Sequence, residues 1–381
     1  MDYIAQAFTG GFGALSTSPQ QLVRRISELA DSLQVQAVIM GWSTDRTLYQ
    51  AALEELHRRG MQGYLWMPVF SEMSSVVQGI PAVDYDGNRH RSAHVSEEED
   101  FTFVCPSNPQ NIEHVKEIYS SYFAGLGFDG VFLDKIRYSS FGNGFKPAIG
   151  CFCEQCRARY EHEGVDLTEL RRYMAQEDKQ FLLPFAFENG RYLFADNFIN
   201  KLFKVRSDII TKSVAELSGW FKEQGLQVGL DVYAPVFAYY VGQDILSLSQ
   251  HADFIKPMIY RVTDAPAGIP YEQQSMQREL RANGCEPGDV LGRLWKTDDL
   301  CSEQSLTAQL EALKGAHCKI YSGFEINAKP GICRTDVEYI RRTVQTLQNA
   351  GAARAVLSWD ILSDTCGHIE LLSKLEQGEG V

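Results

Sequence analysis

Short apolar segments alternate with amphipathic ones along the 381-residue chain, and this alternation constrains the fold more than any other feature. The short segments are rich in Val, Ile, Leu and aromatic residues. Apolar runs of this length between helical stretches are typical of parallel strands that are buried on both faces. The predicted strands are residues 3–8, 35–40, 64–70, 129–134, 227–232, 253–260, 319–326 and 355–359.

Helical signals lie between these segments. Ser18 followed by Pro19 is typical of a helix start, and apolar residues follow at helical spacing. The other predicted helices are residues 45–59, 108–122, 197–224, 271–282, 303–314 and 335–349. Strand–helix units repeated in this way around one core predict an α/β fold of the (β/α)8 TIM barrel class. Residues 290–295 fall outside the alternation and are interpreted as an extra strand.

An open doubly wound sheet is the alternative fold. Its dinucleotide-binding form carries a Gly-x-Gly-x-x-Gly pattern after the first strand. Residues 10–13 read Gly-Gly-Phe-Gly, so the third glycine is missing at the required offset. The barrel is therefore favoured.

Two long polar connections interrupt the alternation: residues 71–104 after the third strand and residues 139–190 after the fourth. Loops of such length are usually functional or disordered. No linker rich in Pro, Gly or Ser divides the chain. We therefore expect residues 1–381 to form a single barrel domain, with both connections inserted as loops over the barrel mouth.

The formal net charge of −13 disfavours nucleic acid or an anionic membrane as the main partner. The sequence contains no apolar run of the ~20 residues needed to span a bilayer. Residues 1–5 do not resemble a secretory signal, and most of the nine cysteines stand alone, as reduced thiols do. These features predict a cytoplasmic protein without a membrane partner, and nothing in the sequence indicates its oligomeric state.

Residues 128–138 read Phe-Asp-Gly-Val-Phe-Leu-Asp-Lys-Ile-Arg-Tyr, so a short apolar run ends in charged residues. Unpaired charges cannot lie inside a buried strand, which places Asp134 and Arg137 at its C-terminal end. Active sites of α/β barrels lie at that end of the strands. Asp134 is therefore the first candidate for a catalytic group.

A closed barrel would bring further strand ends to the same mouth. Glu325 follows the seventh strand and Asp231 the fifth, so both are candidate catalytic acids. Carboxylates beside aromatic platforms are what a sugar site requires, because sugar ring faces stack on aromatics and a carboxylate pair cleaves the glycosidic bond. The candidate substrate-binding residues are Trp42, Arg137, Tyr138, Tyr233, Lys256, Tyr260, Asn327, Trp359 and Asp360.

Structural roles are the alternative for several of these residues. Asp231 is equally explained as a helix cap or as one member of an ion pair. Asp360 is explained as a cap for the following helix, and Lys256 as a countercharge for a nearby acid. Trp359 is explained as part of the core.

The sequence also resembles a known group of proteins. Residues 128–138, the upstream Cys-Pro-Ser-Asn-Pro and the downstream Cys-Phe-Cys-Glu-Gln-Cys resemble the TIM-barrel "hypothetical glycosyl hydrolase" families, relatives of the α-amylase and α-galactosidase type barrels. The resemblance spans about residues 101–360 and is clearest between 105 and 160. It implies a glycoside hydrolase acting on a carbohydrate, with Asp134 as nucleophile and Glu325 as the second acid.

The mechanism predicted from these residues is retaining hydrolysis without a catalytic cofactor. Asp134 would attack the anomeric carbon, and Glu325, or failing it Asp231, would protonate the leaving oxygen. The chain lacks the Asn-Glu pair that ends the fourth strand of many β-glycosidases, in which the strand-seven acid is the nucleophile. Two alternatives stay open: a catalytically inactive carbohydrate-binding barrel, and a sugar isomerase or lyase whose carboxylates hold a divalent metal.

A separate motif places Cys151, Cys153 and Cys156 within six residues. Thiolates at this spacing are typical of structural zinc, which takes four tetrahedral ligands. Cys105 is the preferred fourth ligand, with His162 or a water as alternatives, and ordinary free thiols are the competing interpretation. The motif thus predicts a structural zinc site that holds the second insertion over the barrel mouth.

Overall fold

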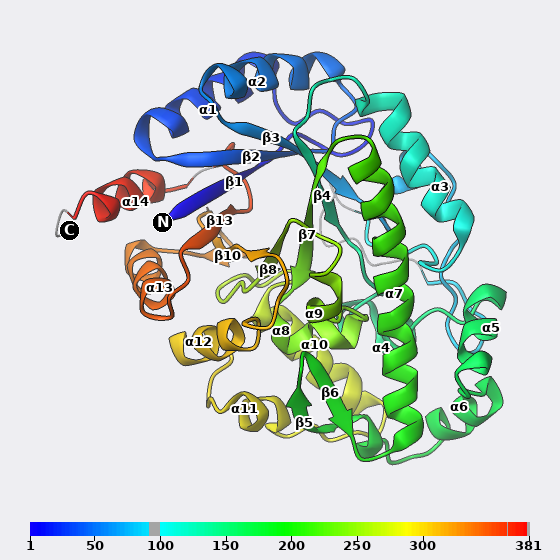
Figure 1. Ribbon diagram of the computed structural model, residues 1–381. Coiled ribbons are helices and arrows are strands. Elements are labelled where there is room, and N and C mark those ends of the chain that lie inside the picture. Colours follow the sequence, from blue (N-terminus) through cyan, green and yellow to red (C-terminus); the bar gives the residue numbers. More distant parts are fainter. Residues whose placement is uncertain (91–99, 364, 379–381) are drawn as a thin grey trace.

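The computed structural model describes residues 1–90, 100–363 and 365–378 and contains a closed parallel β-barrel surrounded by helices (Figure 1). The barrel strands are β1 (Asp2–Phe8), β2 (Val35–Gly41), β3 (Gln62–Pro68), β4 (Gly130–Asp134), β7 (Gln227–Tyr233), β8 (Phe254–Met258), β10 (Ser322–Glu325) and β13 (Arg354–Ser358). Neighbouring strands pair in parallel in this order, and pairing of β10 with both β8 and β13 closes the ring. The short β9 (Lys319–Ile320) also pairs with β8 and belongs to the seventh barrel strand. The predicted (β/α)8 barrel is confirmed.

The helices between the strands lie outside the ring (Figure 1). They are α1 (Pro19–Ser32), α2 (Arg46–Arg58), α3 (Pro109–Ile118) continued by a π-helical turn (Tyr119–Phe123), α7 (Asn197–Glu223), α10 (Ile269–Ala282), α12 (Glu303–Glu311), α13 (Val337–Asn349) and α14 (His368–Glu376). Ser18 caps α1 through its hydroxyl, and Gln21 completes a reciprocal capping box. Among the described residues, no helix joins enough length to enough apolar content to cross a lipid bilayer.

The segment between β4 and α7 folds into several small elements. They are a 3-10 turn (Phe141–Asn143), α4 (Phe145–Ile149), α5 (Glu154–His162), α6 (Leu167–Met174), a second 3-10 turn (Gln180–Leu182), and a hairpin of β5 (Pro184–Glu188) and β6 (Arg191–Phe194). In Figure 1, α5 and α6 lie at the edge of the molecule beside α7. The segment after β3 contains a 3-10 turn at Met73–Ser75.

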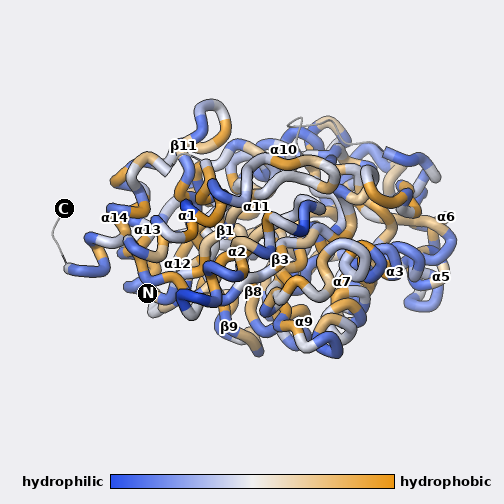
Figure 2. Tube along the Cα trace, turned by 90° about the horizontal axis from the view of Figure 1, so that it is seen from above, coloured by the Kyte–Doolittle hydropathy of each residue, from blue (hydrophilic) through white to orange (hydrophobic). Residues whose placement is uncertain are grey.

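The remaining short elements belong to other loops. They are α8 (Pro235–Ala238), a 3-10 turn (Tyr239–Val241) and α9 (Ile245–Leu248) after β7, and the hairpin of β11 (Ala328–Lys329) and β12 (Cys333–Arg334) after β10. Figure 2 shows the β11–β12 hairpin projecting beyond the rest of the chain.

The extra strand predicted at residues 290–295 is wrong, because this segment forms helix α11 (Val290–Trp295). Leu291 and Trp295 are four residues apart and buried, a helical spacing that a six-residue run displays too briefly to reveal. The indole of Trp295 donates a hydrogen bond to the hydroxyl of Tyr192 at 2.7 Å, and its ring lies 4.7 Å from that of Phe187. Packing on the β5–β6 hairpin thus stabilises the helix.

Aromatic side chains fill the inside of the barrel. The rings of Phe132 and Phe254 stack with centroids 5.8 Å apart, and Tyr64 meets Phe254 edge-on at 5.3 Å. Gly229 makes room for them, since a Cβ at this position would lie 2.2 Å from the Phe254 ring. The barrel is therefore a packed core, and space for a ligand is found at its end.

Candidate active site

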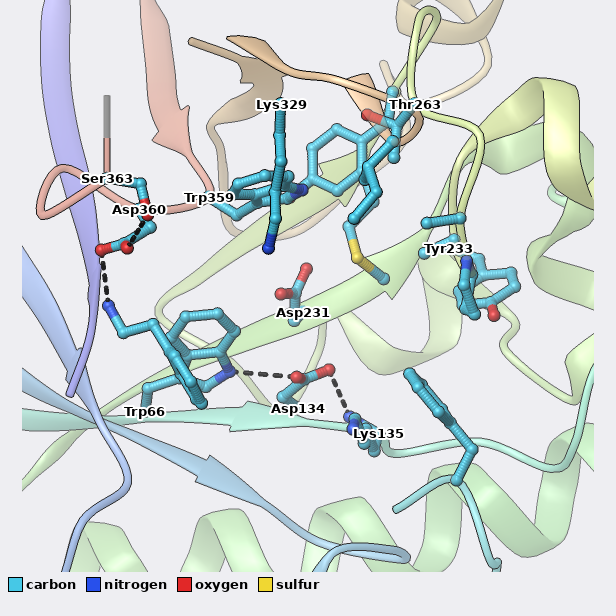
Figure 3. Close-up of a pocket in the computed structure, with 18 of the residues that line it drawn as sticks. Trp66, Asp134, Lys135, Asp231, Tyr233, Thr263, Lys329, Trp359, Asp360 and Ser363 are labelled. Carbon is cyan, nitrogen blue, oxygen red and sulfur yellow. Dashed lines mark hydrogen bonds between the residues drawn. The ribbon is translucent and has the colours of Figure 1, made fainter. Parts of the chain in front are cut away.

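A cavity of about 380 Å³ opens at the C-terminal ends of the strands (Figure 3). Its lining includes Phe8 from β1, Trp66 from β3, Asp134 from β4, Asp231 from β7 and Met258 from β8. Loops beyond the strand ends complete the wall. A volume of this size lies within the range of small-molecule sites in proteins.

Asp134 is the last residue of β4 and is 7% exposed. The indole N–H of Trp66 donates a hydrogen bond to Oδ2 of Asp134 at 3.0 Å, and the amide of Lys135 donates to Oδ1 at 2.5 Å. Both donors and their hydrogen bonds to Asp134 are drawn in Figure 3. One donor on each oxygen fixes the orientation of this carboxylate in the cavity.

Asp231 shares the cavity with Asp134, as Figure 3 shows. Burial raises the pKa of Asp231 to about 8; the negative charge of Asp134 adds to this effect, and Lys256 and Arg137 oppose it. Oδ2 accepts a hydrogen bond from the ammonium group of Lys256 at 3.0 Å, whereas Oδ1 has no hydrogen-bond partner in the described chain. At neutral pH this carboxyl group is therefore largely protonated.

Lys256 lies behind Asp231 and does not line the cavity. Its side chain is 1% exposed, and its ammonium group also donates a hydrogen bond to the hydroxyl of Tyr260 at 2.5 Å. Tyr260 itself lines the cavity. The lysine is thus a buried countercharge for the acid, one of the roles expected from the sequence.

Glu325 ends β10, but the structure does not place it in the lining of the cavity. Its Oε1 accepts hydrogen bonds from the amide of Val262 at 2.9 Å and the hydroxyl of Thr263 at 3.0 Å, and its Oε2 accepts one from the hydroxyl of Tyr339. Burial raises its pKa, and these hydrogen bonds partly offset the effect. The hydrogen bonds of the Glu325 carboxylate thus link β10 to the loop after β8 and to helix α13.

The cavity brings together five of the nine predicted substrate-binding residues. They are Arg137, Tyr233, Tyr260, Trp359 and Asp360. Asp360 also accepts hydrogen bonds from the amide of Phe8 at 3.0 Å and the hydroxyl of Ser363 at 2.6 Å, so it ties β1 to the loop after β13. Burial raises the pKa of Asp360, and these bonds lower it.

The other four residues, with Lys256 already described, lie outside the lining. Trp42 is buried edge-on against the rings of Phe8 and Trp66, at 5.0 and 5.1 Å. Tyr138 packs under the guanidinium group of Arg206 at 4.9 Å. The side-chain oxygen of Asn327 accepts hydrogen bonds from the amides of residues 359 and 360, each at 3.0 Å. These residues support the wall from behind.

Sequence reasoning missed several lining residues, among them Trp66, Lys135 and Lys329. Lys135 follows Asp134 directly and forms a buried ion pair with Glu72. Its position directly after Asp134 in the sequence could have marked Lys135 as a candidate lining residue. Trp66 lies two residues after Tyr64, so the two side chains share the inner face of β3, but the sequence of a strand buried on both sides does not reveal which face that is.

The four predicted metal ligands form one cluster. The sulfur atoms of Cys105, Cys151, Cys153 and Cys156 all lie within 4.8 Å of one another. Sγ of Cys105 is 3.3 Å from that of Cys153 and 3.5 Å from that of Cys156. Hydrogen bonding to neighbouring thiols lowers the pKa of Cys153. His162, the alternative ligand, is 83% exposed and bonded to Glu163.

The cluster joins three stretches of chain beside the cavity. The amide of Cys105 donates a hydrogen bond to the carbonyl of Ile80 at 2.9 Å, and the amide of Phe152 donates to the carbonyl of Val83 at 2.8 Å. Just upstream of Cys105, Phe101 lines the cavity and lies 4.0 Å from the Lys135 ammonium group. The four sulfurs thus connect the second insertion to the segment that supplies a cavity wall.

No family model and no curated protein matches the sequence. Among solved structures, the glycoside hydrolase domain of PgaB (BpsB) from Bordetella bronchiseptica is 14% identical with a TM-score of 0.60, and the match covers 98% of each chain. The catalytic domain of beta-amylase from Paenibacillus polymyxa is 11% identical with a TM-score of 0.52, covering 98% of this chain and 97% of the other. Alpha-L-fucosidase isoenzyme 2 from Paenibacillus thiaminolyticus is 12% identical with a TM-score of 0.54, covering 99% and 49%.

The fold is that of glycoside hydrolase barrels. Identities of this size concern the fold alone. The comparisons therefore support the barrel implied by the family resemblance, and the reaction has to be argued from the cavity.

Proposed function

We propose that this barrel is a glycoside hydrolase whose carboxylate pair is Asp134 and Asp231. The proposal depends on one observation: these two acids line the same cavity in different environments. Asp134 is held by a donor on each oxygen, and Asp231 is buried with a pKa of about 8. A buried carboxyl group that keeps its proton at neutral pH is suited to the role of the acid beside a second carboxyl group in the same cavity. Asp231 thus takes the role that the sequence assigned first to Glu325.

In the proposed mechanism, Asp231 donates its proton to the glycosidic oxygen as the bond from that oxygen to the anomeric carbon breaks. Asp134 attacks the anomeric carbon and forms a glycosyl ester. The Asp231 carboxylate then takes a proton from water, and the resulting hydroxide displaces Asp134 with net retention. No catalytic cofactor takes part in these steps.

The surrounding residues have supporting roles in this proposal. Lys256 stabilises the carboxylate that Asp231 becomes after proton donation, because its ammonium group already lies 3.0 Å away. Trp359 offers an apolar face within the cavity on which a sugar ring can stack. Trp66 holds Asp134 in position for attack.

A panel of aryl glycosides tests the reaction. The wild type should release the aryl group from at least one member, and Asp134→Asn and Asp231→Asn should each retain less than about 1% of that rate. Asp264→Asn is the matched control, since Asp264 is exposed beside the cavity without lining it. A fluorinated glycoside that traps the ester should label the peptide containing Asp134.

Full turnover by Asp134→Asn on a confirmed substrate would refute this assignment. Sugar binding without turnover by any variant would favour the inactive carbohydrate-binding alternative. The 3.0 Å contact between Asp231 and Lys256 is the observation that keeps this alternative open, because a binding protein would also place a countercharge beside a buried acid.

We also propose that the four-cysteine cluster holds a structural zinc ion. Four thiol sulfurs in mutual contact match the tetrahedral sulfur set that zinc prefers. The ion would join residues 139–190 to the segment around Cys105 and would take no part in bond cleavage. No disulfide joins the nine cysteines in the described part of the chain, which suits a reducing, cytoplasmic compartment.

Elemental analysis of protein purified without chelator tests the metal. We expect about one zinc per chain in the wild type and in Cys285→Ser, whose thiol lies outside the cluster. Cys153→Ser should lower the zinc content at least severalfold. A wild type without stoichiometric zinc would refute the site.

A further inference from the structure

We infer that the cavity recognises a sugar that carries an anionic substituent, that Arg137 binds this group, and that Lys329 adds a second positive charge to the cavity. The inference rests on the proposed glycosidase function and names its substrate class. It is carried by two cations that line the cavity and have no ionic partner within the described chain.

Arg137 is the stronger of the two observations. Its side chain lines the cavity and is 3% exposed, yet it forms no ion pair with any described carboxylate. One N–H group donates to the carbonyl of Tyr138 at 2.9 Å. The rings of Phe103 and Tyr233 lie 4.6 and 4.4 Å from the guanidinium carbon. The aromatic contacts hold the group in place and leave further N–H donors for a ligand.

Lys329 approaches the cavity from the β11–β12 hairpin. Figure 3 shows its side chain extending into the space above Asp231. No hydrogen bond or ion pair joins its ammonium group to the described part of the protein. The hairpin thus carries a positive charge to the open side of the same cavity.

The described acids in and around the cavity form no salt bridge with Arg137 or Lys329. Asp134 is bonded to an indole and a backbone amide, Asp231 to a buried ammonium group, and Asp360 to backbone amides and a hydroxyl. The buried Glu272 accepts hydrogen bonds from the hydroxyl of Tyr233 and the amide of residue 267. Arg137 therefore forms no salt bridge with these acids, although its charge lowers the pKa values of Asp231 and Glu272 from a distance.

A bound anion would complete this arrangement. Burying a charge without a partner is costly, and the guanidinium fork matches the two oxygens of a carboxylate, sulfate or phosphate. The overall charge of −13 does not prevent binding, because remote surface charges are screened by salt and a cation in the cavity acts on a bound anion at close range. Uronic acids and sugar phosphates share the required chemistry.

The test compares charged and neutral substrates. Nitrophenyl glucuronide and galacturonide, their neutral counterparts, and a nitrophenyl glucoside phosphorylated on its primary hydroxyl would be assayed in both anomeric forms. Binding of free glucuronate, glucose phosphate and glucose would be measured by calorimetry. The variants are Arg137→Met and Lys329→Gln, with Arg172→Met as control, because Arg172 is 72% exposed and bonded to Glu169 on α6.

We expect a preference for one charged class of at least tenfold in kcat/KM over its neutral counterpart. Arg137→Met and Lys329→Gln should reduce that preference, and Arg172→Met should leave it unchanged. Comparing the phosphorylated nitrophenyl glucoside with the glucuronide and galacturonide distinguishes a phosphorylated sugar from a uronic acid as the preferred substrate. Lys329→Gln keeps the test usable if Arg137→Met fails to fold, because Lys329 is exposed.

Hydrolysis of neutral glycosides without any preference for charge would overturn the inference and leave the proposed function standing. An equal loss on charged and neutral substrates in Arg137→Met would also overturn it, because the arginine would then act only on the catalytic acids. Binding of a charged sugar that depends on Arg137, without hydrolysis of any substrate, would support the inference and refute the proposed function.

Discussion

The ammonium group of Lys256 lies 3.0 Å from Oδ2 of Asp231, and the two side chains are 1% and 2% exposed. Burial raises the pKa of the acid, and the lysine limits how far it rises. An acid with a pKa near 8 is protonated at neutral pH and still able to release its proton during catalysis. This pair therefore controls the pH range over which the proposed enzyme works.

The pH profile should reflect this control. Because Asp231 must be protonated to act as the acid, kcat/KM of the wild type should fall as the pH rises through about 8. Lys256→Met removes the charge that favours ionisation, so the fall should move to higher pH. Lys222→Met is the control, since Lys222 pairs with Asp253 at the surface. An unchanged profile in Lys256→Met would contradict the assignment of Asp231 as the acid.

Stability should depend on the same group. The pKa of Asp231 is about 8 in the folded protein and about 3.9 in the unfolded chain, so between these values the unfolded state has lost a proton that the folded state keeps. The free energy of unfolding contributed by this group therefore falls as the pH rises from about 4 to 8. Asp231→Asn cannot ionise, so its stability relative to wild type should increase over this range by about 2–5 kcal/mol.

Urea unfolding of both proteins between pH 5 and pH 8, followed by circular dichroism, measures this difference. Asp264→Asn should show no comparable trend, because Asp264 is exposed in the folded protein. A difference between wild type and Asp231→Asn that stays constant with pH would show that the acid is ionised in the fold.

Trp66 should be needed for positioning Asp134. Trp66→Phe removes the indole donor 3.0 Å from Oδ2 while keeping an aromatic ring in the wall. A charge-assisted hydrogen bond contributes about 1.5–3 kcal/mol, so kcat/KM should fall about 10- to 100-fold. Trp220→Phe on α7 serves as control, since that indole packs against Tyr119 away from the cavity. Equal activity of the two variants would exclude this role.

Loss of the cysteine cluster should be detected both in stability and in the cavity. Cys153→Ser should lower Tm by about 5 °C or more, because structural zinc contributes directly to folding free energy. It should also raise KM, because Cys105 and Phe101 lie on one short segment and Phe101 lines the cavity. Scanning calorimetry and steady-state kinetics would measure the two effects, with Cys285→Ser as control. A normal Tm with normal KM would argue for free thiols.

The barrel could be predicted from the sequence because apolar runs and capped helices alternate strongly. Which of the strand-end acids line the cavity could not be predicted, because it depends on the direction of a single side chain at each strand end. Phe132 and Asp134 share one face of β4, and since Phe132 stacks inside the barrel, Asp134 reaches the cavity. Glu325 also ends a strand, yet its carboxylate bonds to Tyr339 on an outer helix.

Residue type alone was sufficient for the cysteine cluster, since four sulfurs are what zinc requires and Cys105 precedes the neighbouring helix. The positions of Lys135 and Lys329 were harder to predict. A left-handed backbone at Lys135 (φ 53°) and a hairpin fold around Lys329 decide where their ammonium groups lie. Neither conformation is encoded by a local pattern of apolar residues.

The aromatic rings stacked against Gly229 have a consequence for what this protein can process. They seal the interior of the barrel below Asp134 and Asp231, so an occupant must leave by the opening through which it came in. A long polysaccharide cannot pass through a cavity that is closed at its inner end. Any ligand can therefore reach these two acids only from the mouth of the barrel.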